Sequence, residues 1–293
     1  MDEVKECPVI WFQGAGCSGC SVSFLNGVAP GPVDVLIEEV VPGSHVNLRF
    51  HPTIMAASGE PAVEAIRSTQ ETFDGGYVLV VEGAIPEGSF GAMGEENGRE
   101  LHMEDIFVDL AKRSLAVLAF GSCATYGGIP SGAPNPTKAR GVGEVLRSRG
   151  VDKPYINVPG CPPHPDWMTG TVASVLLFGL PAADALDELR RPKRYFGMLI
   201  HDNCPRRAYF DTGRFAKHFG DEGCLLELGC KGPQTYADCP VRQWNGGTNW
   251  CVGCGAPCIG CVEPEFPDRS APFYEKVFED RADQFSVKTK VEG

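Results

Sequence analysis

The sequence PVIWFQGAGCSGC, residues 8–20, decides how the first half of the chain is interpreted. Its apolar run, Pro8–Phe12, predicts a buried β-strand. The glycine-rich residues that follow predict a tight turn, which carries Cys17 and Cys20. The fold therefore places two thiols directly after its first strand.

The turn alone is open to more than one interpretation. The stretch Gly14–Gly19 matches G-x-G-x-x-G, and Asp34 lies 20 residues beyond Gly14, as in a dinucleotide-binding site. The pair Cys17 and Cys20 also has the C-x2-C spacing of a thioredoxin-like redox site. A metal site is the third possibility, so residues elsewhere have to decide.

Further strands and helices alternate along residues 8–180, which predicts an α/β fold with a doubly wound parallel sheet. The other expected strands are Val46–Phe50, Tyr77–Val81, Leu115–Phe120 and Tyr155–Val158. The expected helices are Pro61–Glu71, Met103–Arg113, Ala139–Ser148 and Asp166–Phe178, the last with Asp166 as its N-cap.

Two more cysteines follow predicted strands. Cys123 comes three residues after Phe120, and Cys161 comes three residues after Val158. The carboxyl ends of parallel strands share one edge of a sheet, so Cys17, Cys20, Cys123 and Cys161 should converge there. Four thiolates suit a [4Fe–4S] cluster, whereas a redox pair needs only two sulfurs.

Composition excludes several classes of protein. The 293 residues include 43% hydrophobic and 22% charged residues, which is typical of a soluble globular chain. No apolar run reaches the roughly 18 residues needed for a membrane span. The net charge of −12 opposes binding to nucleic acid or to an anionic lipid surface.

The character of the chain changes after about residue 180. We expect two domains, residues 1–180 and a smaller, loop-rich domain of residues 181–293. The second contains eight of the thirteen cysteines, between Cys204 and Cys261, and it lacks sustained periodicity. Metal centres would organise such a segment. Zinc is an alternative, although only three residues separate Cys254 from Cys258, fewer than a zinc ribbon has between its knuckles.

Several motifs resemble the small, electron-transferring subunit of the [NiFe] and [NiFeSe] hydrogenases. They are the Gly14–Cys20 turn, GSCATYGGIP from Gly121, NVPGCPPHPDW from Asn157, HDNC at His201, GCKGP from Gly229, and WNGGTNWC followed by PCIGCVEPEFPD. The resemblance implies a flavodoxin-like N-terminal domain and a C-terminal iron–sulfur domain, with three [4Fe–4S] clusters in all.

The resemblance also implies the ligands of each cluster. The proximal cluster would be held by Cys17, Cys20, Cys123 and Cys161, the distal cluster by His201, Cys204, Cys224 and Cys230, and the medial cluster by Cys239, Cys251, Cys258 and Cys261.

Cys251 stands where relatives with a three-iron medial cluster have proline. The medial cluster would be [3Fe–4S] if Cys251 did not bind, and Cys254 could compete for the fourth iron. Cys7 and Cys254 have no assigned role. Oxygen-tolerant relatives have two extra cysteines at the positions of Gly19 and Gly128, so an ordinary proximal cluster is expected.

The expected partners are a large subunit with a nickel–iron centre and an external redox carrier, with no membrane span in this chain. The start of the sequence, Met1 to Cys7, is acidic and predicts a cytoplasmic location, with the periplasm as the alternative if this is a processed form. Competing functions are a stand-alone thioredoxin-like or dinucleotide-binding oxidoreductase with structural zinc, and a cluster-bearing subunit of another redox complex.

Overall fold

The computed structural model describes residues 5–28, 31–36 and 44–275. The chain divides into two compact units, Met1–Arg194 and Tyr195–Gly293. The segment 181–194, which the sequence analysis grouped with the second domain, lies in the first unit.

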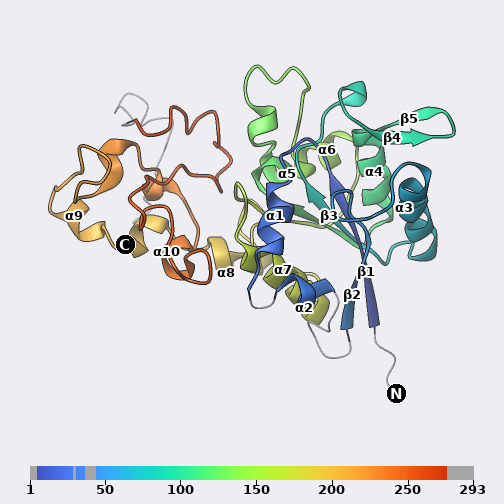
Figure 1. The fold of residues 1–293 in the computed structure, drawn as a ribbon, viewed down its shortest axis with the longest axis horizontal. Helices are drawn as coiled ribbons and strands as arrows, with labels where there is room; N and C mark the ends of the chain where they lie inside the picture. Colours follow the sequence, from blue (N-terminus) through green and yellow to red (C-terminus); the bar gives the residue numbers. More distant parts are fainter. Residues whose placement is uncertain (1–4, 29–30, 37–43, 276–293) are drawn as a thin grey trace. The chain divides into compact units, whose positions relative to one another are not determined.

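Five parallel strands form the central sheet of the N-terminal unit (Figure 1). They are β1 (Lys5–Gln13), β2 (Ser44–Phe50), β3 (Val78–Glu82), β6 (Ala116–Phe120) and β7 (Tyr155–Val158), in the spatial order β2-β1-β3-β6-β7. Numbered along the sheet's own strands, this is the order 2-1-3-4-5 of flavodoxin-like folds. The predicted fold class is confirmed.

The register of the sheet aligns the ends of four strands. Gln13 of β1 pairs with Glu82 of β3, Glu82 pairs with Phe120 of β6, and Phe120 pairs with Val158 of β7. The segments that follow these strands therefore leave the sheet at one level, and cysteines lie in three of them, after β1, β6 and β7.

Helices cover both faces of the sheet. The helices of this unit are α1 (Gly19–Leu25), α2 (Pro32–Leu36), α3 (Glu60–Thr72), α4 (Met103–Arg113), α5 (Ser122–Tyr126), α6 (Val142–Ser148) and α7 (Pro165–Phe178). Buried side chains of α3, α4 and α6 join Ile10, Phe12 and Leu79 in one hydrophobic core. On the other face Trp11 packs edge-on against Phe24 of α1, with ring centroids 5.4 Å apart. Figure 1 shows α3 and α4 on the side of the sheet away from α1.

Helix α7 begins one residue earlier than expected, at Pro165. Its N-cap is His164, whose Nδ1 accepts a hydrogen bond from the Asp166 amide at 3.1 Å. The prediction of Asp166 as the cap is therefore wrong. Pro165 explains the shift, because proline lacks an N–H and suits the first helical position.

A two-stranded hairpin, β4 (Ala92–Glu96) and β5 (Arg99–His102), stands outside the main sheet. Its turn is Asn97-Gly98, with positive φ at both residues (53° and 75°). This is the conformation of a two-residue hairpin turn.

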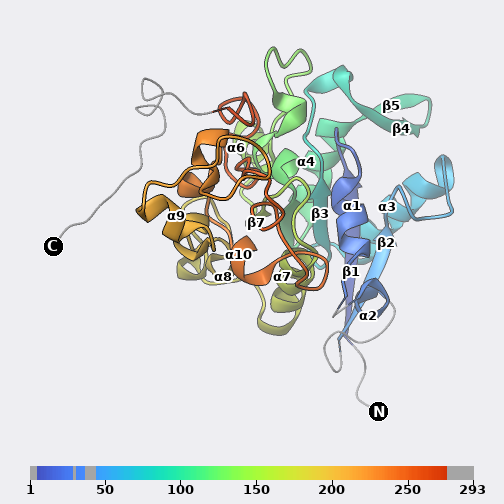
Figure 2. The same cartoon turned by 60° about the vertical axis from the view of Figure 1, so that its left-hand side comes forward.

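The C-terminal unit is built mostly from loops and short helices (Figure 2). Its elements are η4 (Ile200–Asn203), α9 (Arg207–Asp211), η5 (Leu225–Leu228), η6 (Gly232–Gln234) and α10 (Cys239–Arg242), while α8 (Lys193–Phe196) spans the division between the units. Among residues 195–275 there is no β-strand, only isolated bridges.

Candidate metal centres

The first set of thiols gathers at the carboxyl edge of the sheet. Cys17 lies in the loop after β1, Cys20 in α1, Cys123 in α5, and Cys161 in the loop after β7. Burial, followed by the Glu82 carboxylate and the thiols of Cys123, Cys17 and Cys161, raises the pKa of Cys20 well above its usual value. The structure therefore brings all four predicted residues within electrostatic range of one another.

The chemistry of this set suits a cationic metal centre. Burial raises the pKa of Cys123 to about 11, and the neighbouring Cys161 thiol adds to the effect. Several thiolates cannot be ionised side by side in a buried site unless positive charge is nearby. Iron would supply that charge, so these four cysteines are suitable ligands for an iron–sulfur cluster.

Two glycines bring the backbone close to the sulfurs. At Gly121 (φ 91°) a Cβ would lie 2.5 Å from the Cys20 Sγ. At Gly128 (φ 51°) it would lie 3.0 Å from the Cys123 Sγ. Both positions have a left-handed backbone and no room for a side chain, so the loops form a close cradle around the thiols.

A buried carboxylate that the sequence analysis missed orders the cysteine turn. Glu82, at the end of β3, is 3% exposed. Its Oε1 accepts hydrogen bonds from the Cys20 amide at 3.0 Å and the Ser21 amide at 3.1 Å. Its Oε2 accepts from Trp11 Nε1 at 2.9 Å, from Gln13 Nε2 at 3.0 Å and from the Ser21 hydroxyl. The only sequence signal was an acid that closes the otherwise apolar strand VLVVE.

His51 completes this polar network. Its Nδ1 accepts from the Thr53 amide at 3.2 Å, so Nε2 carries the proton and donates to the Ser21 hydroxyl at 3.1 Å. Burial lowers the pKa of His51, and the Glu82 carboxylate opposes that shift. The ring lies against Trp11, with centroids 5.0 Å apart.

The position of Asp34 does not match a dinucleotide site. Asp34 lies in α2, before β2 begins, and its carboxylate accepts from the Gly31 amide at 2.6 Å. A ribose-binding acid belongs at the carboxyl end of the second strand. In this sheet β2 ends at Phe50 instead.

The second set lies in the C-terminal unit. The Cys230 pKa is raised mainly by burial, and the thiols of Cys204 and Cys224 contribute. Three residues before Cys204 lies His201, which is 9% exposed and packs edge-on against Phe210 at 4.6 Å. Within the described residues its Nε2 is buried without a hydrogen-bond partner. A buried imidazole nitrogen without a hydrogen-bond partner suits a metal ligand.

The third set groups Cys239 with Cys261 and Cys251. The pKa of Cys239 is raised well above its usual value, mainly by burial and then by these two thiols. The pKa of Cys258 is likewise raised, mainly by burial, then by the Cys230 thiol, and then by the thiols of Cys261 and Cys239. Cys251 and Cys254 are both exposed, and the Cys254 thiol adds to the effect of burial in raising the pKa of Cys251.

All thirteen cysteines lie within the described residues, and none forms a disulfide. Cys7 lies in β1 and belongs to none of the three sets. No group of three or more His, Cys, Asp or Glu side chains in the described residues is placed to hold a metal ion. In a four-iron cluster each protein ligand binds a different iron, so its ligands need not converge on one point.

Comparisons with known proteins agree with this architecture. Residues 17–175 match the family model of the NADH ubiquinone oxidoreductase 20 kDa subunit, and residues 196–274 match the C-terminal model of the NiFe/NiFeSe hydrogenase small subunit. The chain is 46% identical to the periplasmic [NiFeSe] hydrogenase small subunit of Desulfomicrobium baculatum, over 92% of this chain and 87% of that protein. The chain belongs to the hydrogenase small-subunit family.

Two further comparisons extend this result. A crystal structure of the reduced, active Ni-Fe-Se hydrogenase from Desulfomicrobium baculatum superposes with a TM-score of 0.87, at 46% identity, over 93% of this chain and all of that one. The periplasmic [NiFe] hydrogenase small subunit 1 of Nitratidesulfovibrio vulgaris is 41% identical, over 91% of this chain and 81% of that protein. As a hydrogenase small subunit, the chain is an iron–sulfur protein that works with a large subunit.

The predicted cytoplasmic location is wrong on this comparison, because both relatives are named periplasmic. That prediction relied on the acidic residues at the start of the sequence. An exported protein need not retain its targeting segment, so those residues do not report the compartment. Within the described residues, no helix of this hydrogenase small subunit is long and apolar enough to cross a bilayer.

Proposed function

We propose that this hydrogenase small subunit holds three [4Fe–4S] clusters and relays electrons between the nickel–iron site of its large subunit and an external carrier. The observation that carries the proposal is the gathering of Cys17, Cys20, Cys123 and Cys161 at the carboxyl edge of the sheet, where their thiols affect one another's pKa values. In the C-terminal unit it is supported by the effects of Cys204 and Cys224 on the pKa of Cys230, and of Cys261 and Cys251 on the pKa of Cys239. Bound clusters would each accept and release one electron without a proton.

The proposed sets keep the assignments made from the sequence. The proximal ligands are Cys17, Cys20, Cys123 and Cys161, the distal ligands are His201, Cys204, Cys224 and Cys230, and the medial ligands are Cys239, Cys251, Cys258 and Cys261. The chain's own work is to hold and orient these ligands. Glu82 does so for the proximal set by fixing the amides of Cys20 and Ser21.

Exposure near the proximal set supports a docking face for the large subunit. Cys17 is exposed, although a cluster ligand belongs in a dry site. Nearby, Val22 and Leu25 on α1 are 57% and 43% exposed, and Ile129, next to Gly128, is 58% exposed. A large subunit on this face would cover apolar surface and the proximal ligands together.

Iron and sulfide analysis of the purified complex tests the number of clusters. Three cubes require about twelve iron atoms and twelve acid-labile sulfides per small subunit, with nickel in the co-purifying large subunit. Zinc without sulfide would contradict the proposal. The periplasmic names of the relatives support an exported enzyme, whose carrier would then meet it outside the cytoplasm.

The fourth medial ligand is the most sharply testable assignment. The thiols that raise the pKa of Cys239 are those of Cys261 and Cys251. This supports Cys251 over Cys254 as the fourth medial ligand. Cys251→Pro should release one iron and leave a [3Fe–4S] cluster, which is paramagnetic when oxidised, whereas the oxidised four-iron cube is silent. We expect a near-stoichiometric three-iron signal by electron paramagnetic resonance in this variant. Cys254→Ser is the matched control, and a three-iron signal in the control alone would move the ligand to Cys254.

A further inference from the structure

Two loops of the C-terminal unit are joined by reciprocal hydrogen bonds. The Lys231 amide donates to the Cys258 carbonyl oxygen at 2.7 Å. In the other direction, the Cys258 amide donates to the Cys230 Sγ at 3.4 Å. Cys230 belongs to the proposed distal set and Cys258 to the proposed medial set. One hydrogen bond therefore connects a ligand of each set.

Thr235 lies in the interior of the C-terminal unit, at the contact between these two loops. It is 1% exposed, and its hydroxyl donates to the Lys231 carbonyl oxygen at 2.7 Å. The Thr235 hydroxyl oxygen also accepts a hydrogen bond from the Cys258 thiol, with the Cys258 Sγ at 3.8 Å. One hydroxyl thus touches the residue after Cys230 and the sulfur of Cys258.

Backbone bonds tie Thr235 to a third ligand loop. Its carbonyl oxygen accepts from the Ile200 amide at 2.9 Å, and Ile200 precedes His201. A Cβ at Gly260 would lie 3.5 Å from the hydroxyl oxygen, in ordinary van der Waals contact, so Gly260 packs beside it. Thr235 contacts residues next to, or part of, ligands in both sets, although it is not a ligand itself.

We propose that Thr235 is a positioning residue that fixes the contact between Cys258 and Cys230, and that electrons cross between the medial and distal sets at this contact. The inference rests on the proposed three-cluster function. With clusters bound, one electron would pass from the cluster held by the medial set, which would be oxidised, to the cluster held by the distal set, which would be reduced. No bond or proton changes place, and hydrogen oxidation supplies the electron.

Thr235 also adjusts the medial set. A metal-bound Cys258 thiolate has no proton, so the Thr235 hydroxyl becomes the only possible donor of the pair, and its one hydrogen would be shared between the Lys231 carbonyl oxygen and the Cys258 sulfur. Hydrogen bonds to a ligand sulfur stabilise the more negative, reduced cluster. Removal of the hydroxyl should therefore lower the reduction potential of the medial cluster and weaken the contact between Cys258 and Cys230.

The test compares Thr235→Val with Thr235→Ser in the intact two-subunit enzyme. Valine has nearly the shape of threonine without the hydroxyl, and serine keeps the hydroxyl. We expect Thr235→Val to retain wild-type iron and sulfide, to slow flash-induced electron equilibration between the two sets several-fold, and to lower the medial potential in a titration followed by electron paramagnetic resonance. Amide exchange at Lys231 and Cys258 should become faster. Thr235→Ser should restore all three properties.

Unchanged equilibration and potential in an iron-replete Thr235→Val enzyme would overturn the inference, as would equal effects of valine and serine. If valine lowers the iron content, Thr235→Ala removes the hydroxyl without a second methyl group, and wild-type equilibration in that variant would also overturn it. Fewer than three clusters in the wild-type enzyme would instead refute the proposed function, so the two failures are distinguishable.

Discussion

The Ser21 hydroxyl joins the two buried polar side chains nearest the proximal set. It accepts from His51 and donates to Glu82. His51 is 4% exposed, and burial lowers its pKa. Its charged form is thus disfavoured in the folded chain, and this has a consequence for stability in acid.

Acid should destabilise the sheet through His51. The folded pKa lies below the unfolded value of about 6.5, so below that pH the unfolded chain binds more protons, and stability falls as the pH falls. His51→Gln should cost about 1 kcal/mol at pH 7 through the altered hydrogen bond, yet reduce the further loss between pH 7 and pH 5. Hydrogen exchange of β1 and β3 amides measures both effects.

The control for this prediction is His218→Gln, because His218 is exposed (side chain 85%) and lies in the other unit. It should leave exchange in β1 and β3 unchanged. An equally steep acid loss in wild type and His51→Gln would show that other groups cause it.

At the scale of single residues, the sequence predicted candidate metal ligands better than the residues that orient them. Cys123 and Cys161 were found because each directly follows a recognisable strand, and thiols are rare enough to stand out. Glu82 was missed because its role depends on the register of β1 and β3, which sets it beside Gln13. No local pattern reports that pairing.

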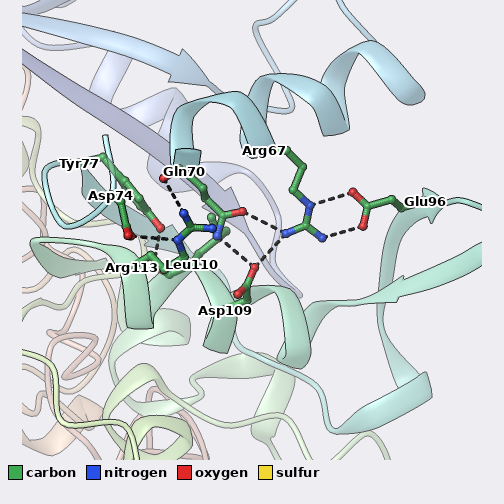
Figure 3. Close-up of polar contacts among 8 residues, drawn as sticks. All are labelled: Arg67, Gln70, Asp74, Tyr77, Glu96, Asp109, Leu110 and Arg113. Carbon is green, nitrogen blue, oxygen red and sulfur yellow. Dashed lines mark hydrogen bonds and ion pairs between the residues drawn. The ribbon is translucent and has the colours of Figure 1, made fainter. Parts of the chain in front are cut away.

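At the scale of elements, an ion-pair network links the hairpin to two helices (Figure 3). Arg67 of α3 forms two hydrogen bonds with Glu96 of β4, both 2.8 Å, and one with Asp109 of α4 at 2.9 Å. Gln70 donates to the same Asp109 carboxylate at 3.0 Å. The guanidinium side chain is 27% exposed, so this bidentate pair is partly shielded from water.

Arg67→Ala should destabilise the hairpin by about 1 to 2 kcal/mol, more than a typical exposed pair, because the interaction is bidentate and partly buried. Faster amide exchange in β4 and β5 would show it. Lys138→Ala is the control, since Lys138 makes an exposed pair with Glu87 at 3.0 Å, and it should change stability by less than about 0.5 kcal/mol. Equal effects of the two substitutions would contradict the prediction.

The elements themselves were predictable where burial imposes a pattern. The fully buried strands β3 and β6 read as apolar runs, and α4 has the expected bounds, Met103–Arg113. The hairpin was not predicted because AMGEE and RELH lack apolar alternation, although Asn97-Gly98 is a turn signal. Exposed strands leave a weaker trace in sequence than buried ones.

At the scale of the whole molecule, the two units differ in what stabilises them. A large hydrophobic core lies in the N-terminal unit, with buried residues from Ile10 to Leu146. The described part of the C-terminal unit has no strand, and α9, its longest helix, has five residues. Eight proposed ligands lie there, between His201 and Cys261, against four in the other unit. Periodicity could not predict this unit, because ligands rather than an apolar pattern would organise it.

Removal of iron should therefore affect the units unequally. Ligand binding contributes directly to folding where long helices and strands are absent, so chelation under reducing conditions should abolish amide protection in the C-terminal unit. The five-stranded sheet should stay protected, because its strands are buried by apolar contacts that involve no ligand. Hydrogen exchange with mass spectrometry, before and after chelation, separates the two regions.

Cys161→Ser provides a matched comparison, since it removes a proposed ligand from the N-terminal unit alone and should leave the C-terminal unit protected. Uniform loss of protection across both units after chelation would mean that the apolar core cannot sustain the sheet without iron.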